Sequence, residues 1–441
     1  MPQPKYILLA IIILISIWPG VSPAANDNPQ PAPQIITGPS LADLITTAYT
    51  KNPDILAAKA EWQAEIELYR ITTAYPDPQL MVTYFNEPIE TRLGPQDWSA
   101  NLSQKIPFPG KLSKAGEMVT ADIRIARLNL DKTVRDTITD LRLAFHELFY
   151  ISKAREIALE NSKLLEQIRK QGETAYAEDK AALIDVVKAQ SQTAQLQYDQ
   201  LLLAELAQTE KAKINAILDR PPDAAIGILV PEPIKELTYS LEEIYRLAEI
   251  NQEEIKIAQE NINKAEAGKD LATYQALPDF TVGLFYAGIG EPDTASKPIN
   301  AGQDAMGIQA GMNIPLWYSK SSGQINQAKA KLSKAKEMKS ARLNKTKANI
   351  SQVYFRLNNA GRLIKLYSES LLPQATAAIS TAETWYREGQ GSFSDFIETQ
   401  ATVYNFQLSL ARAQADYGKY LAKLEGLTGR KLTTAPAEAQ R

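Results

Sequence analysis

The strongest constraint on the fold of this chain is a large internal duplication. Ile255 corresponds to Ile55 and Pro278 to Pro78, and the offset is 200 residues in both pairs. Each copy has the pattern of a helix, a strand, a loop, a second strand, a very long helix, a turn and a final helix. The 441 residues therefore predict two equivalent structural units rather than two unrelated domains.

Alternating side chains mark the second strand of each copy. The apolar face carries Trp98, Ala100, Leu102 and Ile106 in the first copy, and Met306, Ile308, Ala310, Met312 and Ile314 in the second. The intervening residues are mostly polar or glycine, which predicts strands with one apolar and one polar face. Proline cannot donate to a sheet ladder, so strand-to-helix turns are expected at Pro107, Pro109 and Gly110, and again at Pro315.

These patterns divide the chain into six segments. Residues 1–24 are read as a signal peptide, because the apolar run Ile7–Ile17 is too short to span a membrane and small residues follow it. An extended, proline-rich arm is expected over 25–39, and a flexible tail over 431–441. The first repeat covers 40–220, with strands at about 79–86 and 97–106, and a connector follows over 221–239. The second repeat covers 240–430, with strands at about 279–288 and 305–314. In the first repeat, the opening helix is expected to reach about Ala74, and Asn86–Asp97 is expected to be a loop.

The long helices predict a rod. Apolar residues at heptad spacing follow Gly110: Val134, Ile138, Leu141, Phe145 and Leu148. A helix of about sixty residues is roughly 90 Å long, which exceeds the core of an ordinary globular domain. The two shorter helices of each repeat match that length when stacked end to end, so the strands of both repeats are expected together at one end of a rod of paired helices.

If this protein enters a membrane, it is expected to do so through its strands, because no stretch after the signal segment has the length and hydrophobicity of a membrane helix. Four strands cannot close a barrel alone, since closed outer-membrane barrels begin at about eight strands. Open strand edges are not tolerated in lipid. Two or three chains are therefore expected to share one barrel.

An ordered set of motifs resembles the TolC-like outer-membrane efflux protein family. The motifs are PDPQL (76–80), SQKIPFPGK (103–111), LPDF (277–280), NIPLW (313–317), LLPQA (371–375) and YREGQGSFSDFIETQ (386–400). The resemblance implies a mainly α fold with a small transmembrane β part. In such a protein a homotrimer forms a 12-stranded β-barrel, and a long α-helical periplasmic tunnel continues it. The implied partners are a periplasmic adaptor, an inner-membrane pump of the resistance-nodulation-division type and the outer-membrane lipid of a Gram-negative bacterium. The FPGK turn is most similar to the heavy-metal-efflux branch, although the N-terminal acylated cysteine common in that branch is absent.

The same resemblance assigns candidate site residues. The family closes its tunnel at the helical tip, and its pattern places gate acids at Asp395 and Glu398, with the tip bend at Tyr386, Gly389 and Gly391. A solvated helix start is the alternative explanation of these acids. Asp185 corresponds to Asp395 in the first hairpin, but Lys188 replaces the second acid, so a gate role for Asp185 is left open. The residues expected to face lipid are Trp98, Leu102, Ile308 and Met312.

Composition argues against several other functions. The chain has no cysteine, one histidine and a formal charge of −3, so neither thiol chemistry nor a nucleic-acid partner is indicated. His146 alone cannot form a metal site and is expected to pack or lie at the surface. Met81, Met306 and Met312 could suggest a soft-metal path, but Met306 and Met312 share the apolar face of their strand, which favours lipid contact for them. There is no phosphate loop or nucleophile motif, so neither an enzyme nor a cofactor is predicted.

The predicted function is the outer-membrane exit duct of a tripartite efflux system, which conducts passively and has heavy-metal cations among its candidate substrates. Two alternatives remain. One is the duct of a type I protein secretion or drug efflux system. The other is a periplasmic coiled-coil adaptor or scaffold, which explains the helices but leaves the two strand pairs without a role.

Overall fold

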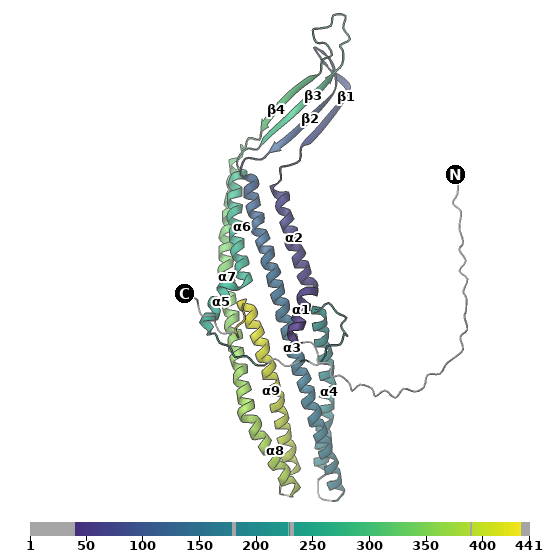
Figure 1. The fold of residues 1–441 in the computed structure, drawn as a ribbon, viewed down its shortest axis with the longest axis vertical. Helices are drawn as coiled ribbons and strands as arrows, with labels where there is room; N and C mark the ends of the chain where they lie inside the picture. The colour runs from purple at the N-terminus through teal and green to yellow at the C-terminus, as the bar shows by residue number, and fades with distance from the viewer. Residues whose placement is uncertain (1–39, 179–181, 228, 230–232, 389, 434–441) are drawn as a thin grey trace, which may run out of the picture.

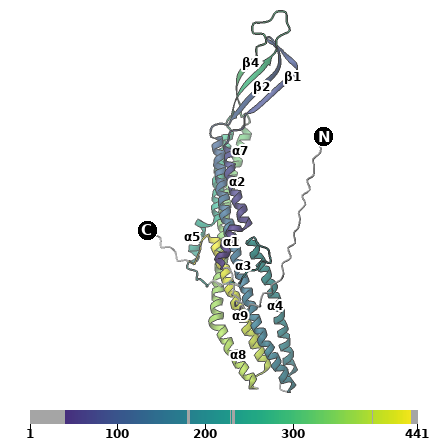
Figure 2. The same ribbon diagram turned by 45° about the vertical axis from the view of Figure 1, so that its right-hand side comes forward.

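The computed structural model describes residues 40–178, 182–227, 229, 233–388 and 390–433. The expected signal peptide, the N-terminal arm and residues 434–441 of the expected tail lie outside this part of the chain. The described chain is an elongated rod, with one sheet at one end and the tips of two helical hairpins at the other (Figures 1 and 2). Within the described residues no helix has the length and hydrophobicity needed to cross a membrane.

The helices follow the duplicated order expected from the sequence. Those of the first repeat are α1 (Leu41–Lys51), α2 (Pro53–Thr73), α3 (Lys111–Ala177) and α4 (Leu183–Ile217). Those of the second are α5 (Leu241–Asn251), α6 (Glu253–Gln275), α7 (Tyr318–Lys365), the π-helix η1 (Leu366–Leu371), α8 (Leu372–Arg387) and α9 (Phe393–Thr428). With its 67 residues, α3 is about 100 Å long.

The opening helix of each repeat is broken once, whereas the sequence of the first repeat predicts one helix up to about Ala74. Asn52 has extended backbone angles, accepts a hydrogen bond from the Ile55 N–H, and precedes Pro53 at the first helical position. Gln252 breaks the second repeat at the corresponding place with nearly the same angles. The break therefore belongs to the repeated unit, and proline is not required for it.

The four strands form one antiparallel sheet in the order β1-β2-β3-β4. They are β1 (Gln79–Thr91), β2 (Gly94–Ile106), β3 (Phe280–Ile289) and β4 (Ala305–Met312). The prediction of a loop over Asn86–Asp97 is wrong, because β1 and β2 extend through most of this segment and meet at a tight turn. Pro88 does not interrupt the hairpin, since it lies in an irregular stretch where the β1–β2 register shifts between Tyr84 and Ile89.

A short π-helix joins α7 to α8 without ending the helical path. Pro373 lacks an N–H group and would clash with the carbonyl four residues before it in a regular α-helix. In η1 the Leu372 N–H donates instead to the Tyr367 carbonyl, five residues back. The second long helix therefore passes the proline by a local change of pitch.

The helices lie side by side in two stacked levels. Beside the sheet the contacts give the order α2, α3, α6, α7, and toward the tip they give the order α4, α3, α9, α8. Of the described helices, only α3 and the path α7-η1-α8 run through both levels. The predicted seam on α3 is confirmed at its centre, because Leu141, Phe145 and Leu148 are fully or almost fully buried.

The contact between the two repeats includes the single histidine. His146 on α3 lies against Gly418 on α9, where a Cβ atom would be only 2.4 Å from the imidazole. Burial, with a smaller contribution from the charges of Arg142 and Lys419, lowers the pKa of His146 to about 4. His146 therefore packs as a neutral ring, one of the two placements expected from the sequence.

Lowering the pH should reduce the stability of the folded protein because His146 is buried without a charge. The unfolded chain binds a proton at His146 near pH 6.5, whereas the folded chain does so only near pH 4. Stability is thus unaffected above pH 6.5 and falls through this window by roughly 1–3 kcal/mol. Thermal unfolding of the parent and His146→Gln from pH 7.5 to pH 4 should show a shallower loss in the variant. Parallel curves would contradict the prediction.

Candidate functional site

The sheet presents one continuous apolar face. Leu80, Leu102, Leu284 and Ile308 are paired in register across all four strands and therefore point to the same side. The same side carries Val82, Tyr84, Trp98, Phe280, Val282, Tyr286, Met306 and Met312. Most of these side chains are exposed to solvent, and the exposed fraction reaches 85% for Ile308. In a single chain this is an uncovered apolar surface.

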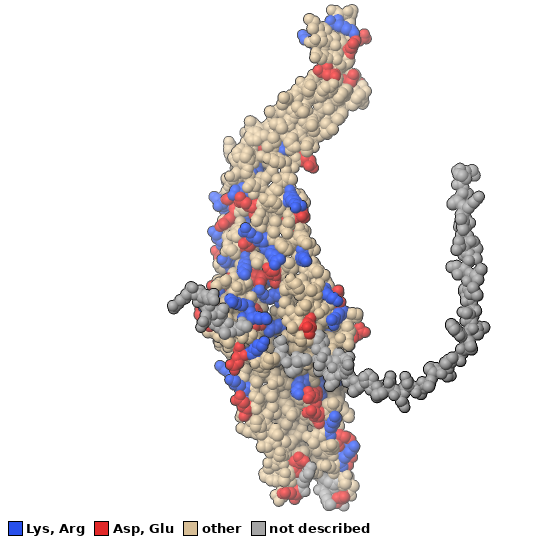
Figure 3. Space-filling view, in the orientation of Figure 1, with Lys and Arg blue, Asp and Glu red and all other residues tan. Residues whose placement is uncertain are grey.

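The opposite face is polar or small. It carries Gln79, Thr83, Ser99, Asn101, Ser103, Gly283, Gly307 and Gln309, with Met81 and Phe285 as apolar exceptions. Figure 3 shows almost no charged side chains over the middle of the sheet, whereas the helices carry both signs of charge. The residues expected to face lipid, Trp98, Leu102, Ile308 and Met312, all lie on the apolar face.

A cluster around Asp279 joins the two repeats where the sheet meets the helices. The Asp279 carboxylate accepts hydrogen bonds from Lys111 Nζ at 2.6 Å and from the Phe108 N–H at 3.0 Å, and Lys105 Nζ lies 3.1 Å away. Burial alone would raise the pKa of Asp279, but these donors outweigh it and lower the pKa to about 2. The carboxylate therefore holds the PFPGK turn of the first repeat against the start of β3.

The turn itself depends on Gly110. Its φ of +96° is in the left-handed region, and a Cβ atom there would lie 2.5 Å from the Tyr274 ring of α6. The corresponding turn of the second repeat, after Pro315, is built differently, because Trp317 precedes α7 with an ordinary φ of −89° and both Trp317 and Tyr318 are largely exposed. Sequence reasoning placed both turns but missed Asp279, because its partners are about 170 residues away.

Removing the charge of Asp279 should loosen this junction. Asp279→Asn keeps the shape of the side chain but weakens its bonds to two lysines, so we expect a loss of roughly 1–3 kcal/mol in unfolding free energy. The contribution of the charge is complete above about pH 4 and is lost only as the pH falls through 2. Thermal unfolding in detergent at pH 7 measures it. Glu291→Gln, which breaks an exposed loop ion pair with Lys297, is the control, and equal melting temperatures for both variants would contradict this role.

At the other end of the rod, the start of α9 separates apolar from acidic side chains. Phe393, Phe396 and Ile397 are buried between the two hairpins, whereas Asp395 and Glu398 are exposed. Ser392 caps the helix by accepting a hydrogen bond from the Asp395 N–H at 3.1 Å, which leaves the Asp395 carboxylate unused. Among the described side chains neither acid has a cationic partner; Glu398 has only a long contact of 3.5 Å with the Ser394 hydroxyl.

The first hairpin reaches this region through α4. Lys188 Nζ donates to the Ser394 hydroxyl at 2.7 Å, which places a cation beside the start of α9. Asp185 is half-buried near Tyr386; burial raises the pKa of that tyrosine, and the charge of Asp185 raises it further. The structure therefore brings Asp185 to the tip but surrounds it differently from the exposed Asp395.

The tip bend is held by aromatic packing and backbone bonds. The Tyr386 ring lies 5.2 Å from that of Phe393 and 6.4 Å from that of Phe396. The Gln390 and Gly391 N–H groups both donate to the Trp385 carbonyl, and a Cβ atom on Gly391 would lie 3.0 Å from that of Trp385. Gly389, the third residue assigned to the bend, lies outside the described residues.

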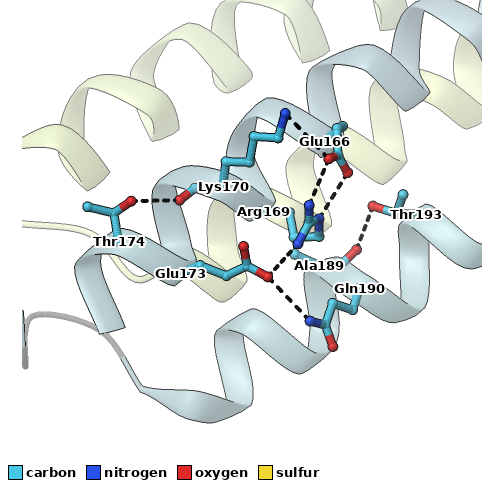
Figure 4. Close-up of polar contacts among 8 residues, drawn as sticks. All are labelled: Glu166, Arg169, Lys170, Glu173, Thr174, Ala189, Gln190 and Thr193. Atoms are coloured by element: carbon cyan, nitrogen blue, oxygen red, sulfur yellow. Dashed lines mark hydrogen bonds and ion pairs between the residues drawn. The ribbon is translucent and has the colours of Figure 1, made fainter. Parts of the chain in front are cut away.

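Two acids of the first hairpin, Glu166 and Glu173, share one arginine. Arg169 binds Glu166 at 2.7 Å and also pairs with Glu173, which in turn accepts a hydrogen bond from Gln190 of α4 at 3.4 Å (Figure 4). The bond with Glu166 is the main reason that the pKa of Arg169 lies above its ordinary value. The two hairpins thus differ, because Arg169 pairs with two acids of the first, whereas neither Asp395 nor Glu398 of the second has a cationic partner among the described side chains.

Residues 244–430 match the family described as outer membrane efflux protein. A search of curated proteins finds no match. Three solved structures are similar. The outer membrane protein VceC from Vibrio cholerae matches with a TM-score of 0.73 and 19% identity over 89% of this chain and 96% of that one. CusC matches with a TM-score of 0.75 and 13% identity over 92% and 99%, and the outer membrane channel CmeC from Campylobacter jejuni with a TM-score of 0.72 and 12% identity over 95% and 95%.

The fold is that of outer-membrane channel protomers. Together with the family match over the second repeat, it confirms the predicted resemblance to the outer-membrane efflux proteins. The predicted fold class is confirmed for the single chain, a mainly helical protein with a small sheet. The matched family is described as outer membrane efflux protein and CmeC as an outer membrane channel, which agrees with the predicted class of function.

Proposed function

We propose that three copies of this chain form the exit duct of a tripartite efflux system in the outer membrane of a Gram-negative bacterium. The observation that carries the proposal is a four-stranded sheet with one uncovered apolar face and two unpaired edges, β1 and β4. Three such sheets joined edge to edge give a 12-stranded barrel whose apolar side faces lipid. The polar faces then line a water-filled bore.

The helical levels support the same closure. Near the sheet the outermost helices are α2 and α7, and near the tip they are α4 and α8. Joining the copies at these edges continues the barrel into a long periplasmic tunnel. Exposed apolar residues on α4, including Leu201, Leu202 and Leu206, would be covered by α8 of the next copy.

The tip would act as the gate. Asp395 and Glu398 of three copies form two rings of like charge around the axis, and Asp185 adds a weaker contribution from the first hairpin. The bend at Tyr386 and Gly391 sets where α9 begins. A periplasmic adaptor and an inner-membrane pump of the resistance-nodulation-division type would open the tip and supply the energy.

The duct has a conducting rather than a catalytic role, and its cargo is set mainly by the pump. The FPGK turn favours heavy-metal efflux, while drug efflux and type I protein secretion are the alternatives. A periplasmic scaffold is less well supported, because the apolar face of the sheet would then stay in water.

The assembly can be tested directly. Protein extracted from outer membranes in detergent should have the native mass of a trimer and should form channels in planar lipid bilayers. Cysteine pairs placed between β1 and β4 should cross-link between copies, which is a clean measurement because the chain has no cysteine of its own. A water-soluble monomer that does not enter membranes would favour the scaffold.

A further inference from the structure

One helix of the tunnel wall has a strongly unbalanced charge. Residues 318–365, which form α7, contain twelve lysine and arginine residues and a single acid, Glu337. Its neighbour α6 and the opposite edge helix α2 each contain more acidic than basic residues. Figure 3 shows basic side chains among acidic ones on the α6–α7 side of the rod below the sheet. The excess is therefore a property of this one edge helix.

Only some of these charges are neutralised within the chain. Arg342 pairs with Glu254 at 2.9 Å and Lys347 with Glu249 at 2.6 Å, while Lys339 donates to the Gln259 side chain at 2.7 Å. Six lysines are exposed and have no partner among the described residues: Lys320, Lys329, Lys331, Lys334, Lys336 and Lys345.

The free lysines lie on both flanks of the helix. Leu332, Ala335 and Thr346 mark the stripe of α7 that packs toward its neighbours in the chain. At about 100° per residue, Lys331 and Lys334 project on one side of this stripe, and Lys329 and Lys336 project on the other. The first pair lines a groove of about 630 Å³ between α6 and α7.

The order of the helices decides where the free lysines of α7 lie relative to the bore of the proposed duct. In the proposed duct, α7 has α6 on one side and α2 of the next copy on the other, so its two flanks face the lumen and the outside. Both flanks carry free lysines. Whichever flank is inside, the lumen receives at least two lysines from each of three copies.

We propose that the tunnel wall beneath the barrel is positively charged and that the open duct favours anionic over cationic solutes. This inference rests on the proposed duct and adds a class of cargo to it: inorganic anions and organic molecules with carboxylate, sulfonate or phosphate groups. A narrow bore with low-dielectric walls concentrates ions of the opposite charge. Bare metal cations would meet an attractive ring at the tip and a repulsive wall above it.

The test measures ion selectivity in planar bilayers. The reversal potential in a KCl gradient near 0.1 M gives the chloride-to-potassium permeability ratio. It is recorded in an Asp395→Asn/Glu398→Gln background, so that the tip acids do not contribute. Two double variants are compared, Lys331→Gln/Lys334→Gln and Lys329→Gln/Lys336→Gln. Each is the matched control of the other, because they remove equal charge from opposite flanks of one helix.

We expect one pair to lower the permeability ratio by about twofold or more and the other to leave it unchanged. The effect should shrink near 1 M salt, where the Debye length is about 3 Å. An unchanged ratio in both variants, or an equal change in both, would overturn the inference while leaving the duct intact. Absence of any conductance in the parent would instead contradict the proposed duct.

Discussion

A positive charge on the apolar face of the sheet should destabilise the assembled channel by roughly 2–4 kcal/mol, whereas the same charge one residue away should have little effect. Ile308 and Gln309 are adjacent on β4 and point to opposite faces. Ile308 is in register with Leu284, and Leu284 with Leu102, so these positions lie at one level of the proposed barrel. Near the bilayer midplane an arginine cannot be hydrated without cost, but in a water-filled bore it can.

The matched variants are Ile308→Arg and Gln309→Arg, with Leu102→Arg and Asn101→Arg as a second pair on β2. Urea unfolding in lipid bilayers measures the difference within each pair. Because each pair adds the same side chain to the same strand, effects on strand propensity largely cancel. Equal losses on both faces would show that the sheet does not separate lipid from water as proposed.

The faces of the sheet could be read from the sequence because strand geometry is local. Side chains alternate with a period of two, so the spacing of Trp98, Leu102, Ile308 and Met312 already placed each pair on one face of its strand. The register adds that both pairs share one face of the sheet. The seam of α3 was equally accessible, since heptad spacing describes a single helix. These features depend on the order of nearby residues.

Other features depend on contacts between distant residues and were missed. Asp279 pairs with lysines that belong to the other repeat, and no pattern of nearby residues predicts these ion pairs. The hydrogen bond between Lys188 and Ser394 joins two hairpins about 200 residues apart. Pro88 suggested a loop that the structure does not have, because the irregular β1–β2 register accommodates it. Pro373 did not indicate the π-helix that accommodates it.

The candidate site falls between these cases. The spacing of Asp395 and Glu398 predicted one shared helix face, and both are exposed at the start of α9. The contrast with the compensated acids of the first hairpin required the structure. Likewise the lysines of α7 are visible in the sequence, but charged helix faces are usually solvated. Only the order of the helices shows that α7 is an edge whose flanks would face the lumen and the outside.

The gate prediction concerns the same exposed acids. We expect Asp395→Asn with Glu398→Gln to keep the trimer intact but to weaken the block of single-channel current by multivalent cations, raising the half-blocking concentration about tenfold or more. The fold should survive, because Ser392 caps α9 through the backbone of residue 395 and the apolar side of the helix is untouched. The physical reason is that six carboxylates, two from each copy, would surround a narrow axis without cationic partners of their own.

Two variants make this prediction specific. Asp185→Asn should have a smaller effect, since Asp185 is half-buried near Tyr386 and its hairpin has Lys188 in place of a second acid. Glu166→Gln removes an acid of the first hairpin that Arg169 already neutralises, so it should leave the block unchanged. The measurement is conductance in a planar bilayer with the cation added on the tip side. If the double variant is blocked as strongly as the parent, Asp395 and Glu398 form an ordinary solvated helix start, and the constriction lies elsewhere.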